Sequence, residues 1–506
     1  MKSFMRHKIR VAGYTNLAIV VMVATYLFVM PAGTLLGDLN DPGLRSGSMP
    51  GFAFRWHRSL SEHFEPWAIK RVVSGRAAQL DTGGVSGTEW PIFSAVYYLW
   101  SSEALQDAWD ADPSPAPVAP KAYARGAITA AAALVADPNQ AAWVRAYWGP
   151  NYLHRENLFY RMLLISGLTS YEKLEGRTPY EALLRDQVES LSAELDASPY
   201  GLLDDYPGQC YPIDILPAIA AIRRADAVLG TDHSAFVSRA LRGFQGTRLD
   251  ARTGLPAYIA DSGSGQGIGS ARGVGISSML TWAPELWPET AHQWYGAYTA
   301  KFWQAGPALA GFREFPKGYP VSDWFALDVD AGPVIGGYGT AASAFGLAAA
   351  RANGHFEQAY PLGAEALVAA WPLPDGTLLS PQLLSNLSDA PYVGEAALLF
   401  SFTRSPVSST VLPANDGLPP SVYVLLLAYP VIGFLWILAA LRRLRRTLGA
   451  GEQALADGQF FLWLALTTAG VVSILLSLVL AGGLCLLAAQ FLPHLDTKEN
   501  PLTERK

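Results

Sequence analysis

The sequence predicts an all-α protein in which a large helical domain is anchored by three transmembrane helices. Half of the 506 residues are hydrophobic and only 16% are charged, whereas about a quarter are charged in a typical soluble domain. Three long apolar runs lie near the two chain ends. Between them helical periodicity recurs, and strand-like alternation is scarce, with residues 255–261 the best short case.

The three apolar runs predict the membrane topology. The first, about residues 14–36, follows four basic residues, and the second, 422–441, ends in an arginine cluster at 442–446. The third, 460–492, is longer than one span of about 20 residues requires, so it tilts or continues as an interfacial helix. Basic flanks favour the cytoplasmic side. We therefore expect the N-terminus and the arginine cluster inside, and residues 37 to about 420 and the C-terminal tail outside.

Two alternatives to this topology remain open at the level of the sequence. Small residues at 31–33 follow the apolar centre of the first run, residues 18–30, so a cleaved signal peptide competes with a retained anchor. The runs could also be buried core helices of a soluble protein. With the retained anchor, we expect the protein in a bacterial inner (cytoplasmic) membrane, with its large domain facing the periplasm.

We divide the chain into an anchor (1–36), an extracytoplasmic helical domain (37–415) and a membrane domain with two spans (416–506). About twelve helices in pairs predict an (α/α)6 toroid, with a solenoid as the alternative. Either fold builds its sites from loops at one end of the array. The expected helix starts lie near Ser59, Ile92, Lys121, Arg155, Pro179, Pro212, Ser234, Gly275, Thr290, Thr340, His355 and Gly394.

Charge and motifs exclude several functions. A net charge of -6 gives no reason to expect nucleic acid as a partner. Cys485 lies in an apolar run and Cys210 does not, so we expect no disulfide between them. The histidines show no HExxH motif or paired ligand spacing, which argues against a metal site. The glycine-rich stretch 262–278 lacks a complete GxGxxG motif, so we expect no nucleotide cofactor and interpret it as a mobile loop that presents Arg272.

The densest polar and aromatic loop is DDYPGQCYPID, residues 204–214. Asp205, Cys210 and Asp214 are its candidate catalytic residues, and Tyr206 and Gln209 are candidate substrate-binding residues. Asp214 begins an apolar helix, so a helix N-cap is the alternative role for it. Cys210 could act as a nucleophile or acid/base group if its pKa is lowered.

A second candidate loop covers residues 80–98, where Asp81 and Glu89 flank a glycine-rich turn. Glu89 precedes Trp90 at a helix start, and an apolar neighbour raises the pKa of a carboxyl group because it penalises the charged form. Both carboxylates are therefore candidate catalytic residues, with Trp90 and Tyr97 as substrate contacts. The alternative for Glu89 is a first-turn residue favoured by the helix dipole.

A third candidate loop precedes a glycine-rich helix start within residues 312–351. Phe312, Arg313, Glu314 and Asp330 are candidate substrate-binding residues there. Charges at this density before a buried helix need mutual pairing, so an arginine–carboxylate network that holds the floor of a cavity is an equal alternative to catalysis.

Several stretches are similar to the linalool dehydratase/isomerase family. They are RENLFYRMLLISGLTSYEKLEGRTPYEALL (155–184), YPGQCYPID (206–214), LGTD (229–232), ARGVGISS (271–278), FREFPKG (312–318) and DVDAGPVIGGYGTAASAFGLAAAR (328–351). The resemblance covers roughly residues 85–400. It implies an (α/α)6 barrel and a periplasmic enzyme without an organic cofactor, which converts linalool to myrcene by dehydration and to geraniol by isomerisation. Asn157, in the first stretch, is a further candidate substrate-binding residue.

The chain departs from the family at its reacting groups. The two active-site cysteines of the family fall near Asp205 and Asp214, and its histidine falls at Leu163, which cannot transfer a proton. The resemblance therefore implies the scaffold more than the proton-transferring residues.

Three classes of function follow from these observations. The first is a lyase or isomerase that acts on an allylic or otherwise activated alcohol, drawn as a lipophilic small molecule from the membrane. The second is a carbohydrate-active hydrolase or lyase of the envelope, which would use the same carboxylates beside aromatic sugar platforms. The third is a non-catalytic envelope protein that binds a ligand. The sequence does not fix the oligomeric state.

Overall fold

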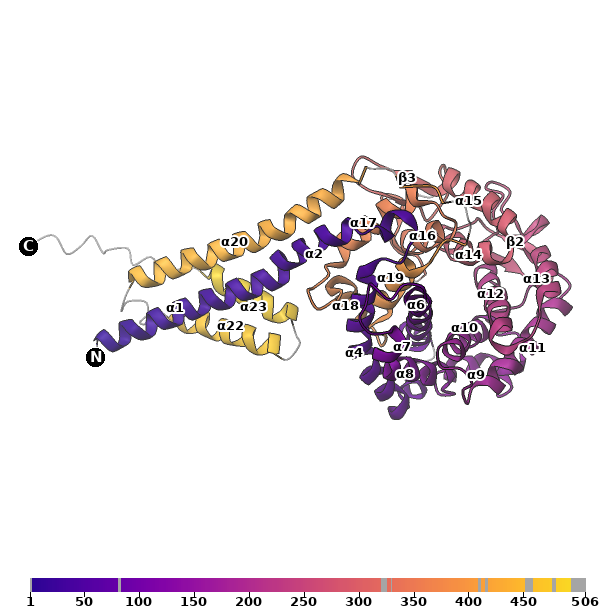
Figure 1. Ribbon diagram of the computed structural model, residues 1–506, viewed down its shortest axis with the longest axis horizontal. Coiled ribbons are helices and arrows are strands. Elements are labelled where there is room, and N and C mark those ends of the chain that lie inside the picture. Colours follow the sequence, from indigo (N-terminus) through magenta and orange to yellow (C-terminus); the bar gives the residue numbers. More distant parts are fainter. Residues whose placement is uncertain are drawn as a thin grey trace, which may run out of the picture. The chain divides into compact units, whose positions relative to one another are not determined.

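The computed structural model describes residues 2–80, 83–319, 325–328, 330–407, 411–414, 417–450, 458–475 and 479–492 (Figure 1). Contacts divide the chain into two compact units. The larger unit is Leu36–Tyr423, and the smaller unit combines Met1–Leu35 with Val424–Lys506. The segments predicted as an anchor and as a C-terminal membrane domain thus pack together in one unit.

The larger unit is mostly helical, as the sequence predicts. Its longer α-helices are α4 (Gly51–Ser74), α6 (Trp90–Ala111), α8 (Arg125–Ala136), α10 (Leu158–Glu175), α11 (Glu181–Ala197), α12 (Pro212–Leu229), α14 (Gly273–Leu286), α15 (Pro288–Phe302), α16 (Thr340–Ala352), α17 (Phe356–Ala370) and α19 (Val393–Thr403). Shorter helical segments are α3 (Gly43–Ser46), η2 (Arg76–Gln79), α5 (Val85–Thr88), α7 (Pro120–Tyr123), α9 (Ala142–Trp148), η3 (Tyr152–His154), α13 (Ser234–Ala240), η4 (Leu241–Phe244), η5 (Gly246–Arg248) and α18 (Leu379–Ser385).

Six helices of the larger unit contact one another in a closed order, which we call the helix cycle. The order is α6, α10, α12, α14, α16, α19 and back to α6 (Figure 1). Other helices pack behind this cycle: α8 lies against α6 and α10, α11 against α10 and α12, α15 against α14, and α17 against α16. Members of the cycle therefore alternate along the chain with helices outside it.

Local sequence explains where several helices begin and end. Pro212 occupies the first turn of α12, where its missing N–H leaves no hydrogen bond unmade, and the helix ends at Gly230 in the left-handed conformation (φ 67°). Small residues let α14 and α16 approach closely. A side chain on Gly273 would collide with the backbone of Arg313 and with Ala342, so this position requires glycine.

Short antiparallel strands connect some of the helices. β1 (Ile259–Asp261) pairs with β2 (Gln266–Ile268), and β3 (Trp303–Ala305) pairs with β4 (Ala310–Phe312). β5 (Phe325–Asp328), β6 (Gly332–Ile335) and β7 (Tyr338–Gly339) form a three-stranded sheet. The inner face of β6 packs on a small core, in which Val334 lies with Tyr258 and Val274.

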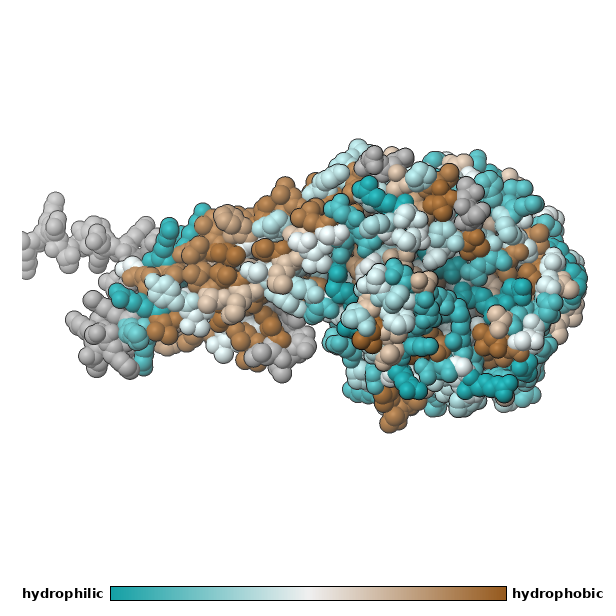
Figure 2. All heavy atoms as spheres, viewed as in Figure 1, coloured by the Kyte–Doolittle hydropathy of each residue, from teal (hydrophilic) through white to brown (hydrophobic). Residues whose placement is uncertain are grey.

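The smaller unit contains α1 (Lys2–Ala24), the π-helical turn η1 (Thr25–Val29), α22 (Gly458–Leu475) and α23 (Val479–Phe491). It also includes the first part of α2 (Met30–Leu39) and most of α20 (Pro420–Ala450). Two described helical stretches, Arg10–Leu39 and Pro420–Gly449, are long and apolar enough to cross a membrane. Figure 2 shows apolar side chains over the surface of α20, where Val424, Leu427 and Phe434 are each more than 60% exposed.

The third apolar run differs from the prediction. It forms two helices rather than one continuous span, and α22 and α23 pack closely against each other. Their contacts run in opposite directions: Ile474 lies beside Gly482, and Thr467 and Gln490 meet at the same residue, Asn16 of α1. Gly470 and Gly482 have no side chains, and this allows the close approach.

Candidate active site

Two hydrogen bonds bring the predicted loops together at the N-terminal ends of the helix cycle. Tyr206, from the loop before α12, donates to Oε1 of Glu89, just before α6, at 2.5 Å. Tyr258, before β1, donates to Oδ2 of Asp330, in the turn between β5 and β6, at 2.7 Å. The ring of Tyr211 packs edge-to-face against Tyr258. We call these groups, with Asp214, the acidic cluster.

Glu89 has the electrostatics of a proton-transfer group. Burial raises the pKa of Glu89 to about 7, and the negative charge of Asp330 adds to this, while the hydrogen bond from Tyr206 opposes it. Glu89 occupies the N-cap position of α6, yet α6 has no side-chain cap hydrogen bond among the described residues. Its carboxylate accepts the hydroxyl of Tyr206 and makes no cap hydrogen bond with α6 among the described residues.

Asp214 lies in the first turn of α12, and the N-cap position belongs to Tyr211. Within the described residues α12 has no side-chain cap hydrogen bond, so the alternative role predicted for Asp214, a capping residue, is wrong. Burial and the negative charges of Asp330 and Glu89 raise the pKa of Asp214 well above its usual range. Asp214 thus lies close enough to Glu89 for the charge of Glu89 to influence its protonation.

Asp205 and Cys210, from the same loop as Tyr206, are fully buried. Asp205 accepts a hydrogen bond from the backbone N–H of Tyr211, and the backbone N–H groups of Tyr211 and Phe159 both favour its charged form. Burial and the charge of Asp214 raise the pKa of Asp205. Burial and Asp205 also raise the pKa of Cys210, so its thiol stays protonated, and this argues against the nucleophile that the sequence suggested.

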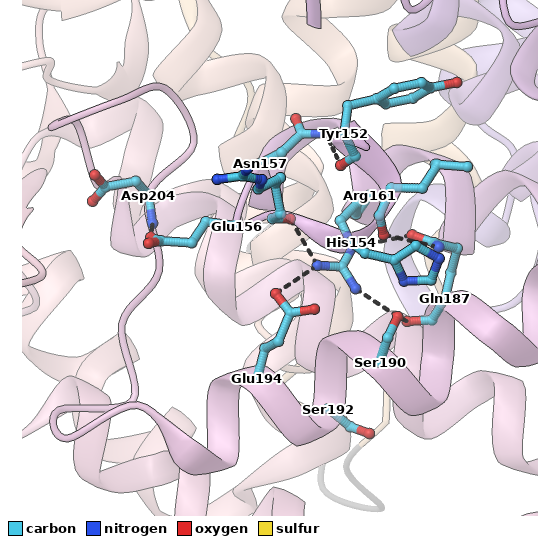
Figure 3. Close-up of polar contacts among 12 residues, drawn as sticks. Tyr152, His154, Glu156, Asn157, Arg161, Gln187, Ser190, Ser192, Glu194 and Asp204 are labelled. Atoms are coloured by element: carbon cyan, nitrogen blue, oxygen red, sulfur yellow. Dashed lines mark hydrogen bonds and ion pairs between the residues drawn. The ribbon is translucent and has the colours of Figure 1, made fainter. Parts of the chain in front are cut away.

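A buried arginine supports the loop that carries Asp205 (Figure 3). Arg161 of α10 donates to the backbone oxygen of Arg155 and to Glu194, both at 2.9 Å, and also to Gln187 and Ser190. The turn that Arg161 holds includes Glu156, whose carboxylate accepts the backbone N–H of Asp204 at 2.7 Å. The position of Asp205 therefore depends on a chain of contacts that reaches α11.

Arg272 belongs to an ion-pair network, the alternative that the sequence left open for this region. Its Nε donates to Glu314 at 2.6 Å, and its Nη2 lies 3.1 Å from Asp328. Its guanidinium lies 4.6 Å from the centroid of the Tyr258 ring. Glu314 also accepts the backbone N–H of Val274 at the start of α14. This network fixes the Tyr258 side of the acidic cluster.

Three other predicted residues are buried or partly buried. Tyr97 is buried, and the charge of Asp214 adds to burial in raising its pKa. Trp90 is partly buried beside Glu89 at the start of α6. Asn157 is fully buried with a left-handed backbone (φ 37°), and its Oδ1 has no partner among the described residues.

Four other predicted site residues lie in the core, beside β4, at an exposed loop tip or outside the described residues. Phe312 is fully buried and stacks on Tyr298, so it is a core residue. Arg313 donates to Gln304 and to the backbone of Phe315, and this holds β4 in place. Gln209 is exposed at the tip of its loop. Asp81 lies outside the described residues.

Two residues of the cluster were not singled out from the sequence. Tyr211 and Tyr258 each contact a predicted residue. Tyr211 lies within a candidate loop and could have been included, whereas Tyr258 lies in a short strand-like segment without polar neighbours. Among the described residues, no group of three or more His, Cys, Asp or Glu side chains is placed to hold a metal ion.

A cavity of about 430 Å³ lies elsewhere in the larger unit. It is lined by residues near the C-terminal ends of α6, α12, α14 and α19, and none of the predicted site residues lines it. The acidic cluster and this cavity are therefore at opposite ends of the helix cycle.

Comparisons with known protein families and with curated proteins give no match to this chain.

Proposed function

We propose that the larger unit is an (α/α)6 toroid that performs acid/base chemistry on a hydroxyl-bearing small molecule at the acidic cluster. The observation that carries this proposal is the pair Glu89 and Asp214, two neighbouring carboxyl groups whose pKa values are both raised. A group with a pKa near 7 exchanges protons efficiently at neutral pH. The closed order of the helix cycle, with further helices packed behind it, supports the toroid.

The first candidate reaction is dehydration or isomerisation of an alcohol, the lyase or isomerase activity implied by the resemblance to linalool dehydratase/isomerase. One carboxyl group protonates the hydroxyl, and the C–O bond breaks to release water and leave a carbocation. The other carboxylate then removes a neighbouring C–H proton to form the alkene, or water adds back at the other allylic carbon. The aromatic rings of Trp90 and Tyr97 would stabilise the positive charge. The reaction needs no cofactor.

Exposure of the cluster favours a second candidate, cleavage of a glycan. Asp330 is exposed, and Glu89, Trp90 and Asp214 are only partly buried. A site open to solvent suits a polar substrate better than a terpene, which binds best in an enclosed apolar cavity. On this reading the same two carboxyl groups act as acid and base across a glycosidic bond.

We further propose that the protein is anchored in a bacterial inner membrane with its larger unit in the periplasm. The apolar side chains exposed on α20 need a lipid or protein environment, because soluble surfaces rarely carry such continuous apolar area. Arg442, Arg443, Arg445 and Arg446 at the end of α20 favour the cytoplasm, and so do the basic residues that begin α1.

The experiment compares the purified full-length protein with Glu89→Gln and Asp214→Asn. Linalool, geraniol and small allylic alcohols are assayed by gas chromatography, and envelope glycans by release of reducing sugars. We expect one substrate class to turn over, and each variant to lose at least about 100-fold in kcat. Asp232→Asn is the matched control, because Asp232 is an exposed aspartate whose Oδ1 accepts the N–H of Ser234, the first residue of α13.

Two outcomes would overturn the proposal. Full activity in both variants would remove the acidic cluster from the reaction. Saturable binding of a substrate without turnover in the unmodified protein would instead identify a non-catalytic ligand-binding protein.

A further inference from the structure

The hairpin of β5 and β6 has a second apolar face, opposite the one that packs on the small core. Ala326 and Val334 point inward to that core, and the residues that alternate with them point outward. We call these four residues the outer hairpin face: Phe325, Leu327, Pro333 and Ile335. The three larger side chains are 55–75% exposed. An antiparallel sheet that covers a core usually presents polar residues on its other face, so this pattern indicates a contact surface.

The register of the two strands makes the outer hairpin face continuous. Phe325 pairs with Ile335, and Leu327 pairs with Pro333. The Cβ atoms of directly paired residues on antiparallel strands lie about 4.5–5.5 Å apart. The four side chains therefore form one patch, whereas apolar residues that are exposed singly are normal on any protein surface.

A short series of contacts connects the outer hairpin face to the start of α20. Ser421, in the first turn of α20, donates its backbone N–H to the oxygen of Ala308 in the β3–β4 turn at 3.1 Å. The backbone oxygen of the next residue, Leu309, accepts the hydroxyl of Tyr338 at 2.9 Å. Tyr338 of β7 pairs with Ile335 of β6. All five residues belong to the larger unit, so the patch and the point where α20 leaves this unit are close together.

Helix α17 holds the same region together. Glu365 of α17 accepts the hydroxyl of Ser421 at 2.8 Å and the backbone N–H of Ala310, the first residue of β4, at 3.1 Å. The short helix α3, which follows α2, also packs against α17. Both helical stretches that are long enough to cross a membrane therefore leave the larger unit beside α17.

A lipid bilayer is the partner that fits this position. The stretch Pro420–Gly449 is apolar from its first turns, and an α-helix rises about 5.4 Å per turn, so a bilayer that α20 crosses begins within about two turns of Ser421. The outer hairpin face consists of four side chains. It is smaller than the roughly 800 Å² that each partner buries in a stable protein complex. Lipid, in contrast, needs no partner surface of matching shape.

We propose that the outer hairpin face lies in the interfacial region of the lipid bilayer beside α20. This inference rests on the proposed membrane anchor and goes beyond it, because an anchor alone does not specify which face of the larger unit meets the lipid. The turn of the same hairpin carries Asp330, whose hydrogen bond with Tyr258 connects it to the acidic cluster. Docking of the hairpin thus keeps the acidic cluster close to the membrane surface.

The test measures contact between single labelled positions and lipid chains, with the full-length protein in phosphatidylcholine nanodiscs. Leu327→Cys and Ile335→Cys each carry the fluorophore nitrobenzoxadiazole, which brominated acyl chains quench on contact. Every variant includes Cys485→Ser, and Cys210 is fully buried, so the introduced thiol is the one that reacts. Interfacial apolar residues lie about 5–10 Å deep, so both positions should lose at least about half of the emission that Val424→Cys loses.

Val424→Cys and Ala193→Cys are the controls. Val424 is exposed near the start of α20, so its label reports on the anchor itself. Ala193 is exposed on α11, which packs behind α10. In the order of the helix cycle α10 lies opposite α16, and α17 packs behind α16. The label at Ala193 should therefore keep its emission in brominated lipid.

The controls separate failure of the docking from failure of the anchor. Quenching at Val424→Cys without quenching at Leu327→Cys and Ile335→Cys overturns the docking and leaves the anchor in place. Labels that keep their emission at all four positions overturn both. Equal quenching at Ala193→Cys and Leu327→Cys overturns the assignment of this particular face. Emission at Leu327→Cys that is shifted to the blue but not quenched would show that a second copy of the chain or another protein covers the patch.

Discussion

The phenol of Tyr206 donates a hydrogen bond to the carboxylate of Glu89, although 117 residues separate the two along the chain. The bond joins the loop before α12 to the start of α6, two helices that are not neighbours in the helix cycle. It therefore fixes the distance between the starts of α6 and α12, at the end of the helix cycle where the acidic cluster lies. It also adjusts the protonation of Glu89, because a hydrogen bond to a carboxylate favours the charged form.

Tyr206→Phe tests this adjustment. Tyr206 lowers the pKa of Glu89 while burial raises it to about 7. Without the phenol we expect the pKa of Glu89 to rise by about one unit, so that the limb of the pH–rate profile due to Glu89 moves to higher pH. Tyr147→Phe is the control, since Tyr147 packs on the Tyr206 ring and is half exposed. An unshifted limb with lower kcat would show that Tyr206 only shapes the site.

Most of the helical fold could be predicted from periodicity and helix-end signals. The predicted starts at Pro212, Ser234 and Thr340 coincide with the first residues of α12, α13 and α16. The first predicted start, near Ser59, was late, because α4 begins at Gly51 with a run of buried aromatic residues that has no clear polar face. Strands of two to four residues, as in β3 to β7, are too short to show a period.

The candidate site was only partly predictable. Loops 80–98 and 204–214 contain carboxylates next to aromatic residues, and Glu89, Tyr206 and Asp214 do come together. The role of Phe312 could not be predicted, because a phenylalanine beside charged residues shows no signal that separates a core contact from a ligand contact. The charged residues that line the cavity could not be predicted from the sequence. Glu103, Arg224 and Glu285 lie on three separate helices, and none of them stands in a distinctive motif.

Glu395→Gln is expected to stabilise the protein at alkaline pH. Burial raises the pKa of Glu395 to about 8, although its Oε1 accepts the N–H of Leu378. The folded state therefore holds a proton that the unfolded chain, with a pKa near 4.5, releases. The contribution of Glu395 to the free energy of unfolding is fully present below about pH 4.5 and is lost as the pH rises towards about 8.

A glutamine at position 395 stays neutral, so Glu395→Gln should be more stable than the unmodified protein by about 1–3 kcal/mol at pH 8, with little difference at pH 5. Denaturant unfolding at the two pH values measures this. Glu62→Gln, at an exposed glutamate, should change neither value. Equal stability of Glu395→Gln and the unmodified protein at pH 8 would contradict the raised pKa.

Arg272→Lys tests the network beside the acidic cluster. Arg272 reaches Glu314 and Asp328 with different nitrogens while it lies over Tyr258. A lysine ammonium cannot form the same fork, and Glu314 would be left buried with a weaker partner. We expect a loss of about 2–4 kcal/mol in the free energy of unfolding, measured by denaturant titration.

The control for Arg272→Lys is Arg239→Lys. Arg239 forms a bidentate pair with Asp196 on the surface, where water screens the interaction, so the substitution should have little effect. A double-mutant cycle of Arg272→Lys with Glu314→Gln isolates the pair. Additive effects in that cycle would show that the two side chains are not coupled.

The contacts of α23 predict the side of the membrane on which the chain continues after it. The carbonyl oxygen of Leu492 accepts a hydrogen bond from Arg443 at 2.7 Å, and Gln490 donates to Asn16 at 3.2 Å. Arg443 belongs to the basic end of α20, and Asn16 follows the basic start of α1. Both basic ends favour the cytoplasm, so we expect α22 and α23 to form a hairpin that returns to the same side, and residues 493–506 to be cytoplasmic.

This expectation is opposite to the external tail predicted from three spans, and residues 493–506 themselves lie outside the described part of the chain. A fluorescent protein fused after Lys506 should fluoresce, and alkaline phosphatase at the same position should be inactive, because each reporter folds on only one side. Fusions after residue 60, within the large domain, should give the reverse pattern. Active phosphatase after Lys506 would show that α22 and α23 together make a single crossing.

Asn16→Leu is expected to weaken the packing of α1 against α22 and α23 by about 1 kcal/mol, the scale of a hydrogen bond between membrane helices.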